Sequence, residues 1–136
     1  MCFDRSGGLV GATIQTYLLE KVRLASHAPR ERSFHIFYQL DRGLEADTDG
    51  ERRAQGLRLE LGLSSLEDYA FACRADGETR VEHPDLDDAR DWLELRAAMK
   101  TLNFSDQAQA GSLRVVAALM HLGNVAFEVK QGAVDG

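Results

Sequence analysis

Cysteine, proline and long apolar runs are all scarce in this sequence. Its 136 residues include 2 cysteines and 2 prolines. Cys2 and Cys73 cannot form the disulfide framework of a small secreted protein, and they fit the reducing cytoplasm. No apolar run approaches the roughly 18 residues that cross a bilayer, and Met1 to Arg5 lack the basic-then-apolar order of a signal peptide. We therefore expect a cytoplasmic chain without membrane insertion.

Positive charge is also in short supply. The chain has 16 Lys and Arg against 22 Asp and Glu, which gives a net charge of −6. Because phosphate binding requires a Lys/Arg surface, this balance argues against a nucleic-acid partner. Hydrophobic residues make up 44%, and a domain of this size hides roughly two-thirds of its unfolded surface. The composition predicts one domain with a hydrophobic core.

Motifs for metal and phosphate chemistry are missing. The four histidines share no metal-ligand spacing: His27, His35, His83 and His121. Two of them, His35 and His121, fall in apolar helical stretches and are interpreted as structural. Ser6-Gly7-Gly8 lacks the Gly-x-x-x-x-Gly-Lys-Ser/Thr order of a phosphate loop and is interpreted as a tight turn.

Clustered charges likewise favour structural roles. The densest carboxylate cluster is Asp85, Asp87 and Asp88, which precedes a predicted helix, where capping is the better interpretation than acid/base catalysis. Basic residues interleave with Glu31 and Glu51 and are interpreted as a solvated face; they are Arg30, Arg32, Arg52 and Arg53. We therefore predict no catalytic residue, no cofactor-binding residue and no metal ligand in this chain.

The N-terminal half predicts a hairpin followed by a helix. Asp4 to Gly8 is turn chemistry, and the alternation from Val10 to Leu19 predicts a strand buried on both faces. Apolar spacing of three and four predicts a helix from Arg32 to about Leu44. Residues 45–56 are charged and are interpreted as a solvated connection or a frayed helix. Ser64-x-x-Glu67 has the form of a capping box before a short helical turn.

Residues 74–87 are polar and predict a loop, and two helices follow it. The first carries one apolar stripe at Trp92, Leu95, Met99 and Leu102. The second is capped by Ser105 or Asp106 and carries two apolar faces that predict deep burial; they consist of Leu113, Val116 and Met120, and of Val115, Leu119 and Leu122.

The chain is expected to close with a turn and a strand. Gly123 is predicted to take the left-handed conformation that ends a helix, and the alternation from Val125 to Lys130 predicts a strand. The fold class is therefore mixed α/β and helix-rich, with an N-terminal β-hairpin, several helices and a short C-terminal strand.

Two N-terminal segments resemble the myosin motor head. Gly11 to Arg23 resembles the stretch GAxIxTYLLEKSRV that follows the switch I loop in those heads, with Val22 in place of Ser. Glu31 to Leu40 resembles the GERNFHIFYQLL that comes next.

Further motifs follow in the same order. Asp87-Asp88, Ala98-Met99 and Leu102 to Ser105 resemble the family's DD…AM…LGFS, with Asn103 in place of Gly. His121 to Phe127 resembles ILHLGNxxF. These motifs cover nearly all of the chain, which is identified as a member of the myosin motor family.

The resemblance implies a domain layout and a set of partners. Residues 1–24 would be a hairpin of the motor's central sheet, and residues 25–136 the helical part of the upper fifty-kilodalton subdomain. The complete motor would use ATP and Mg²⁺, bind the actin filament together with the remainder of the heavy chain, and lie in the cytoplasm on the cytoskeleton. The phosphate loop, switch I and switch II have no counterparts here, so no ATP contact is carried over. Lys130 to Gly136 would approach a surface loop near actin, although a frayed end is the better interpretation.

Two hypotheses about function follow. In the first, the chain is a fragment of a myosin motor domain that couples the nucleotide-bearing sheet to the actin-facing subdomain by packing, and is inactive alone. Its structural residues would be Ile14, Tyr17, Leu18, Phe34, Phe37, Leu113, Val116 and Met120. In the second, the chain is a stand-alone α+β protein-interaction module without ATPase activity. Because a lone two-stranded ribbon is marginal in water, we expect the isolated chain to be poorly soluble or molten, with its C-terminal helices the best-ordered part.

Overall fold

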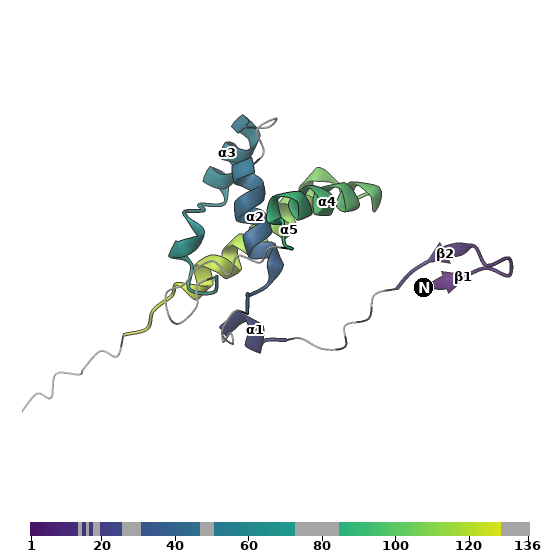
Figure 1. Ribbon diagram of the computed structural model, residues 1–136, viewed down its shortest axis with the longest axis horizontal. Helices are drawn as coiled ribbons and strands as arrows, with labels where there is room; N and C mark the ends of the chain where they lie inside the picture. Colours follow the sequence, from purple (N-terminus) through teal and green to yellow (C-terminus); the bar gives the residue numbers. More distant parts are fainter. Residues whose placement is uncertain are drawn as a thin grey trace, which may run out of the picture.

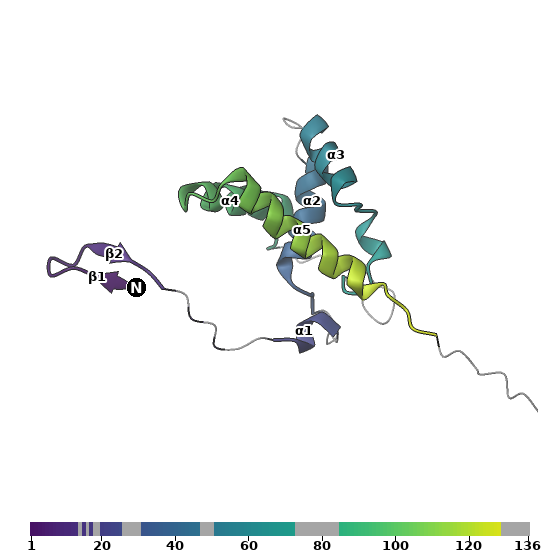
Figure 2. The same ribbon diagram turned by 180° about the vertical axis from the view of Figure 1, so that it is seen from behind.

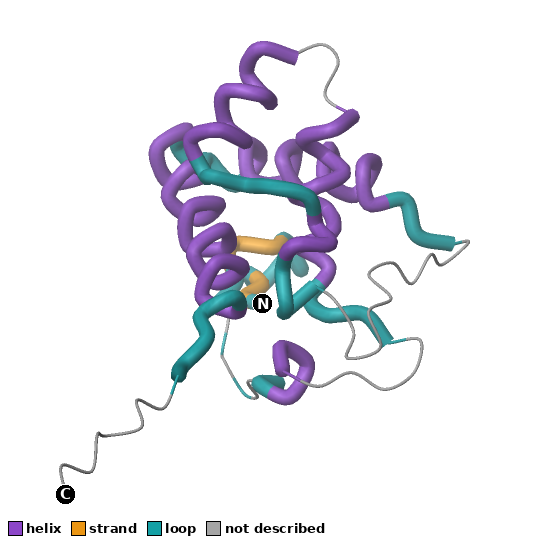
Figure 3. Tube along the Cα trace, turned by 90° about the vertical axis from the view of Figure 1, so that its left-hand side faces the viewer, coloured by secondary structure: helices purple, strands orange, loops and turns teal. Residues whose placement is uncertain are grey.

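A short hairpin and a set of packed helices make up the protein. The computed structural model describes residues 1–13, 15, 17, 20–25, 31–46, 51–72 and 85–128. Its elements in chain order are β1 (Cys2–Phe3), β2 (Leu9–Gly11), α1 (Val22–Ala25), α2 (His35–Ala46), α3 (Glu51–Glu60), the 3-10 helix η1 (Leu66–Asp68), α4 (Asp88–Thr101) and α5 (Asp106–Gly123). Helices dominate the described chain, and its strands are confined to the N-terminal hairpin (Figure 3). The predicted helix-rich mixed α/β class is confirmed.

The hairpin is shorter and more exposed than predicted. β1 and β2 pair antiparallel, and β2 ends at Gly11 rather than Leu19. The alternating residues Ile14, Thr16, Leu18 and Leu19 lie outside the described residues. Burial on both faces is wrong for the described part, since Val10 is 65% and Tyr17 99% exposed. The hairpin stands apart from the helices (Figures 1 and 2), so no second layer from the described part of the chain covers either face.

Helix α2 is the centre of the helical body, since it contacts α3, α4, α5 and η1. Figures 1 and 2 show α5 crossing α2 on one side. α2 begins at His35, three residues later than predicted, because Arg32 and Ser33 are held by tertiary contacts instead of helical ones. The core gathers residues from five parts of the chain: Phe37, Tyr38, Leu40, Leu44, Leu61, Leu66, Tyr69, Ala72, Trp92, Leu113, Ala117 and Met120.

Residues 51–60 form helix α3, so of the two interpretations of residues 45–56, a solvated connection or a frayed helix, the helical one is confirmed from Glu51 onward. Its sequence consists mostly of good helix formers. Leu57 packs on the edge of the core, and the following Leu61 is buried in it. Gly62 then turns the chain at a φ of 62°, a left-handed conformation that glycine adopts without a steric cost.

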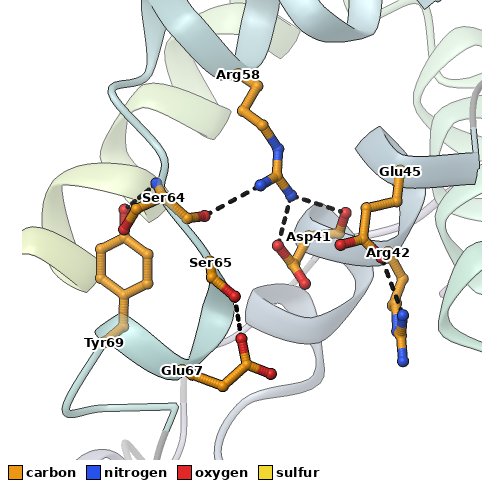
Figure 4. Close-up of polar contacts among 8 residues, drawn as sticks. All are labelled: Asp41, Arg42, Glu45, Arg58, Ser64, Ser65, Glu67 and Tyr69. Atoms are coloured by element: carbon orange, nitrogen blue, oxygen red, sulfur yellow. Dashed lines mark hydrogen bonds and ion pairs between the residues drawn. The ribbon is translucent and has the colours of Figure 1, made fainter.

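The predicted helical turn after Ser64 is present, but its capping box is not. η1 starts at Leu66, with Ser65 in the capping position. The Glu67 carboxylate accepts a hydrogen bond from the Ser65 hydroxyl (Figure 4), whereas a capping box would place it on the Ser64 backbone N–H. That N–H instead donates to the Tyr69 hydroxyl at 3.0 Å. A buried tyrosine has therefore replaced the acid as the partner of Ser64.

Both C-terminal helices begin as predicted. The Asp87 carboxylate accepts from the Arg90 N–H at 3.0 Å, and the Ser105 hydroxyl accepts from the Ala108 N–H at 3.1 Å. Between the helices, Asn103 has a φ of 59°. Asparagine is among the few residues that tolerate this left-handed conformation, which explains how it stands where the resembling motif has glycine.

The end of α5 differs from the prediction in two ways. Gly123 is the last residue of the helix and is not left-handed. Because Gly123 has no side chain, the Phe71 ring can lie close to its backbone. A Cβ at this position would lie 2.7 Å from Cγ of Phe71. The expected closing strand is absent over residues 125–128, which have no strand beside them in the described chain; Val129 and Lys130 lie outside it.

Candidate functional site

The carboxylate of Asp4 occupies the backbone N–H donors of the hairpin turn. Asp4 Oδ1 accepts hydrogen bonds from the backbone N–H groups of Ser6 and Gly8, both at 2.8 Å, and from the Ser6 hydroxyl. The Ser6 hydroxyl is the largest cause of a lowered pKa at Asp4, and the Gly8 and Ser6 N–H groups add to it. A phosphate would need those same N–H donors. The turn is therefore structural, as its sequence predicts.

The described residues do not form a cluster of metal ligands. Across those ranges no three His, Cys, Asp or Glu side chains gather as metal ligands. His35 is exposed at the start of α2, and His27 and His83 lie outside the described residues. Nor is any helix in the described part of the chain both long and apolar enough to span a bilayer.

The predicted carboxylate cluster separates into distinct roles. Asp87 caps α4, whereas the next residue, Asp88, accepts two hydrogen bonds of 2.8 Å from Nη2 of Arg32. The prediction of Arg32 on a solvated face is wrong: it is buried, and its guanidinium carbon lies 3.9 Å from the centre of the Tyr38 ring. The two residues of this ion pair are 56 positions apart, so no local pattern could reveal it.

A second ion pair joins α2 to α3. Arg58 donates to Asp41 Oδ1 at 2.6 Å and to the Ser64 carbonyl at 3.1 Å, which Figure 4 shows as one side chain bridging two segments. Asp41 is buried, while Arg58 is partly exposed. Arg42 and Glu45 pair separately on the outer surface of α2. This arrangement ties α2, α3 and the segment at Ser64 together.

Two residues of the motif at the end of α5, His121 and Asn124, bind the segment around η1. Nε2 of His121 lies 3.1 Å from the Leu61 carbonyl, and its ring packs edge-on against Tyr69 at 5.4 Å. Asn124 accepts from the Ala70 N–H at 2.8 Å and donates to the Asp68 carbonyl. These bonds confirm His121 as a structural helix histidine and give the motif a packing role.

One face of α5 remains uncovered. Of the two predicted apolar faces, Leu113 and Met120 are buried, whereas Val115 is 61% and Leu122 59% exposed. Leu119 lies on the same exposed side, so deep burial of the second face is wrong for this chain. We call Val115, Leu119 and Leu122 the α5 face. Further along, Val125 and Phe127 are exposed as well.

Most of the residues expected to act by packing do so. Phe37, Leu113 and Met120 are buried in the core, and Phe34 and Val116 pack against it. Tyr17 is exposed, and Ile14 and Leu18 lie outside the described residues.

Comparison with known proteins matches nearly the whole chain to a family. Residues 1–135 match the family described as myosin head (motor domain). A probable myosin heavy chain of Encephalitozoon cuniculi is 38% identical over 130 residues, covering 95% of this chain and 7% of that protein. The Myosin-K heavy chain of Dictyostelium discoideum is 37% identical over 126 residues, covering 93% and 13%. Unconventional myosin-Vb of Homo sapiens is 35% identical over 131 residues, covering 95% and 6%. The chain thus spans at most 13% of the length of these three relatives.

Proposed function

Since this chain belongs to the myosin head (motor domain) family, we propose that it is a structural, coupling part of an actin-based motor driven by ATP hydrolysis. Its partners are then the remainder of the myosin heavy chain and, through the complete motor, the actin filament. The motor works in the cytoplasm, on the actin cytoskeleton.

The uncovered α5 face is the observation that carries this proposal. Contiguous exposed apolar residues mark surfaces that other protein covers, and Val115, Leu119 and Leu122 are three such residues on one helix. The hairpin adds Phe3, Leu9 and Val10, all exposed. Both surfaces are interpreted as contacts with the rest of the heavy chain.

The chemistry of ATP belongs to other parts of the motor. Two observations support this proposal: no group of metal ligands forms among the residues described here, and Asp4 occupies the donors of the glycine-containing turn. We therefore assign no catalytic role to this chain. Residues 1–24 serve as a hairpin of the central sheet and residues 25–136 as the helical part of the upper fifty-kilodalton subdomain.

A stand-alone protein-interaction module without ATPase activity is the second candidate. The same exposed α5 face favours it, because an apolar helix face also suits a separate partner. The coding sequence that flanks this chain separates the two candidates. An in-frame phosphate loop and an Asn-x-x-Ser-Ser-Arg stretch upstream support the motor, and an authentic start and stop with promoter signals support the module.

A segment exchange tests the motor directly. The 126 residues of this chain that align with the Dictyostelium discoideum Myosin-K heavy chain replace their counterpart in that protein, and steady-state ATPase is measured with and without actin filaments. We expect the chimaera to hydrolyse ATP and to be activated by actin. A Leu113→Asp variant of the chimaera, which places a charge in the core, is the negative control.

A well-folded chimaera with basal ATPase but no actin activation would contradict the coupling role. Thermal unfolding of the chimaera beside the unmodified heavy chain shows whether it is well folded.

A further inference from the structure

Arg32 and Ser33 connect two parts of the chain by hydrogen bonds. On one side lies α1, the last described element between the hairpin and α2. On the other lies the first residue of α4, Asp88. We propose that Arg23, Arg32, Ser33, Tyr38 and Asp88 form a joint, here called the Arg32 joint, that fixes the position of α1 relative to α4.

The first half of the joint holds α1. The Ser33 hydroxyl donates to the Arg23 carbonyl at 3.2 Å, and Nη1 of Arg23 donates back to the Arg32 carbonyl at 3.4 Å. Arg23 is itself oriented by Glu20, whose carboxylate accepts from it at 2.8 and 3.1 Å. This bond raises the pKa of Arg23 and lowers that of Glu20. Main chain and side chain thus bind α1 to residues 32–33 in both directions.

The second half holds α4. Asp88 accepts both of its 2.8 Å bonds from one nitrogen of Arg32, and charge-assisted hydrogen bonds of this kind are the stronger ones. Asp88 also lies in the first turn of α4, where the helix dipole favours a carboxylate. A shift of Arg32 therefore acts on the start of α4 directly.

Tyr38 of α2 contacts both residues at the centre of the joint. Its ring lies under the Arg32 guanidinium, and its hydroxyl accepts from the Ser33 N–H at 3.1 Å and donates to the Ala72 carbonyl at 3.2 Å. Both Arg32 and Ser33 are buried, so these bonds are shielded from water. The joint consequently holds one geometry instead of acting as a loose tether.

The Arg32 joint deepens the proposed coupling role. Its geometry does not depend on that role, and only the function that we give the joint within a motor rests on it. Within a motor, the joint would pass a displacement of the hairpin, through α1, to α4. Arg32 and Asp88 are positioning residues in this account. The geometry itself can be tested on the full chain, without ATP or actin, so failure of the joint and failure of the proposed function give different results.

Spin labels on α1 and α4 measure how firmly the joint fixes the distance between these two helices. Cys2 and Cys73 are replaced by Ser, and labels are attached to Val22→Cys and Ala97→Cys, two exposed positions. Double electron–electron resonance then gives the distribution of distances between the labels. Two variants break the joint from opposite sides: Asp88→Asn weakens the hold on α4, and Ser33→Ala removes a bond to α1.

Asp91→Asn is the matched control, because it makes the same change one turn along α4 without touching the joint. We expect one narrow distribution in the parent and in Asp91→Asn, and a distribution about twofold wider in both joint variants. Circular dichroism confirms that each variant keeps the parent's helix content. Equal widths in the parent and both joint variants would overturn the proposal, because Leu24 packing on the core would then suffice to hold α1.

Discussion

The indole ring of Trp92 on α4 lies directly against the backbone of Gly43 on α2. A Cβ placed on Gly43 would come within 2.1 Å of Cγ of that ring. Both residues are buried, so neither the ring nor the helix has free space to move into. The two helices therefore pack as closely as they do because residue 43 has no side chain.

Gly43→Ala should destabilise the protein by about 2 kcal/mol, since overpacking of this kind outweighs the gain in helix propensity. Urea unfolding followed by circular dichroism measures the change. Gly56→Ala is the matched control: it lies inside α3, and nothing lies within 4 Å of its added Cβ. That variant should gain up to about 1 kcal/mol. A Gly43→Ala protein as stable as the parent would show that α2 and α4 do not pack this way.

Asn124→Ala removes both hydrogen bonds that clamp the segment around η1 to the end of α5. We expect a loss of about 1–2 kcal/mol in the free energy of unfolding, because each bond contributes about 1 kcal/mol and the residue is exposed. Hydrogen exchange should show the Ala70 amide losing protection. Gln107→Ala, at an exposed position near the start of α5, should change stability by no more than about 0.5 kcal/mol. Equal effects of the two variants would rule out the clamp.

The hairpin turn should respond to acid through Asp4. Its pKa is lowered in the folded turn by the Ser6 hydroxyl and by the Gly8 and Ser6 N–H groups. Because the pKa is lower in the folded turn, the ionised carboxylate stabilises the turn at pH values above its unfolded pKa of about 3.9. This contribution is lost as the pH falls through the folded pKa. In an NMR titration, the Gly8 amide shift should move with a midpoint below about 3.9. Asp4→Asn should abolish the movement, and a midpoint at or above that value would contradict the turn geometry.

The sequence predicted those features that depend on residues close together in the chain. Asp87 and Ser105 each cap a helix by bonding an N–H three residues ahead, so spacing alone identifies them. The stripe that includes Trp92 and the core residues of α5 likewise follow from helical periodicity.

Tertiary partners were not predictable from spacing. Arg32 finds Asp88 from 56 positions away, and Gly123 is required by Phe71, far earlier in the chain. The capping box at Ser64 failed for a different reason, since Tyr69, which is close in the chain, took the donor that the pattern assigned to Glu67. The exposed α5 face shows a further limit: periodicity finds an apolar face but does not identify what covers it.

The solution state of the isolated chain stays a prediction. A closed core around α2 supports a folded helical body, whereas the exposed hairpin and α5 face favour self-association. The structure therefore favours poor solubility over a molten chain.

Titration of the full chain with ATP in the presence of Mg²⁺, followed by isothermal calorimetry, tests the central claim most directly. That claim is that this part of a myosin head acts by packing and carries no nucleotide site. We expect no saturable binding in the micromolar range. Saturable, stoichiometric binding of ATP with a micromolar Kd would contradict it.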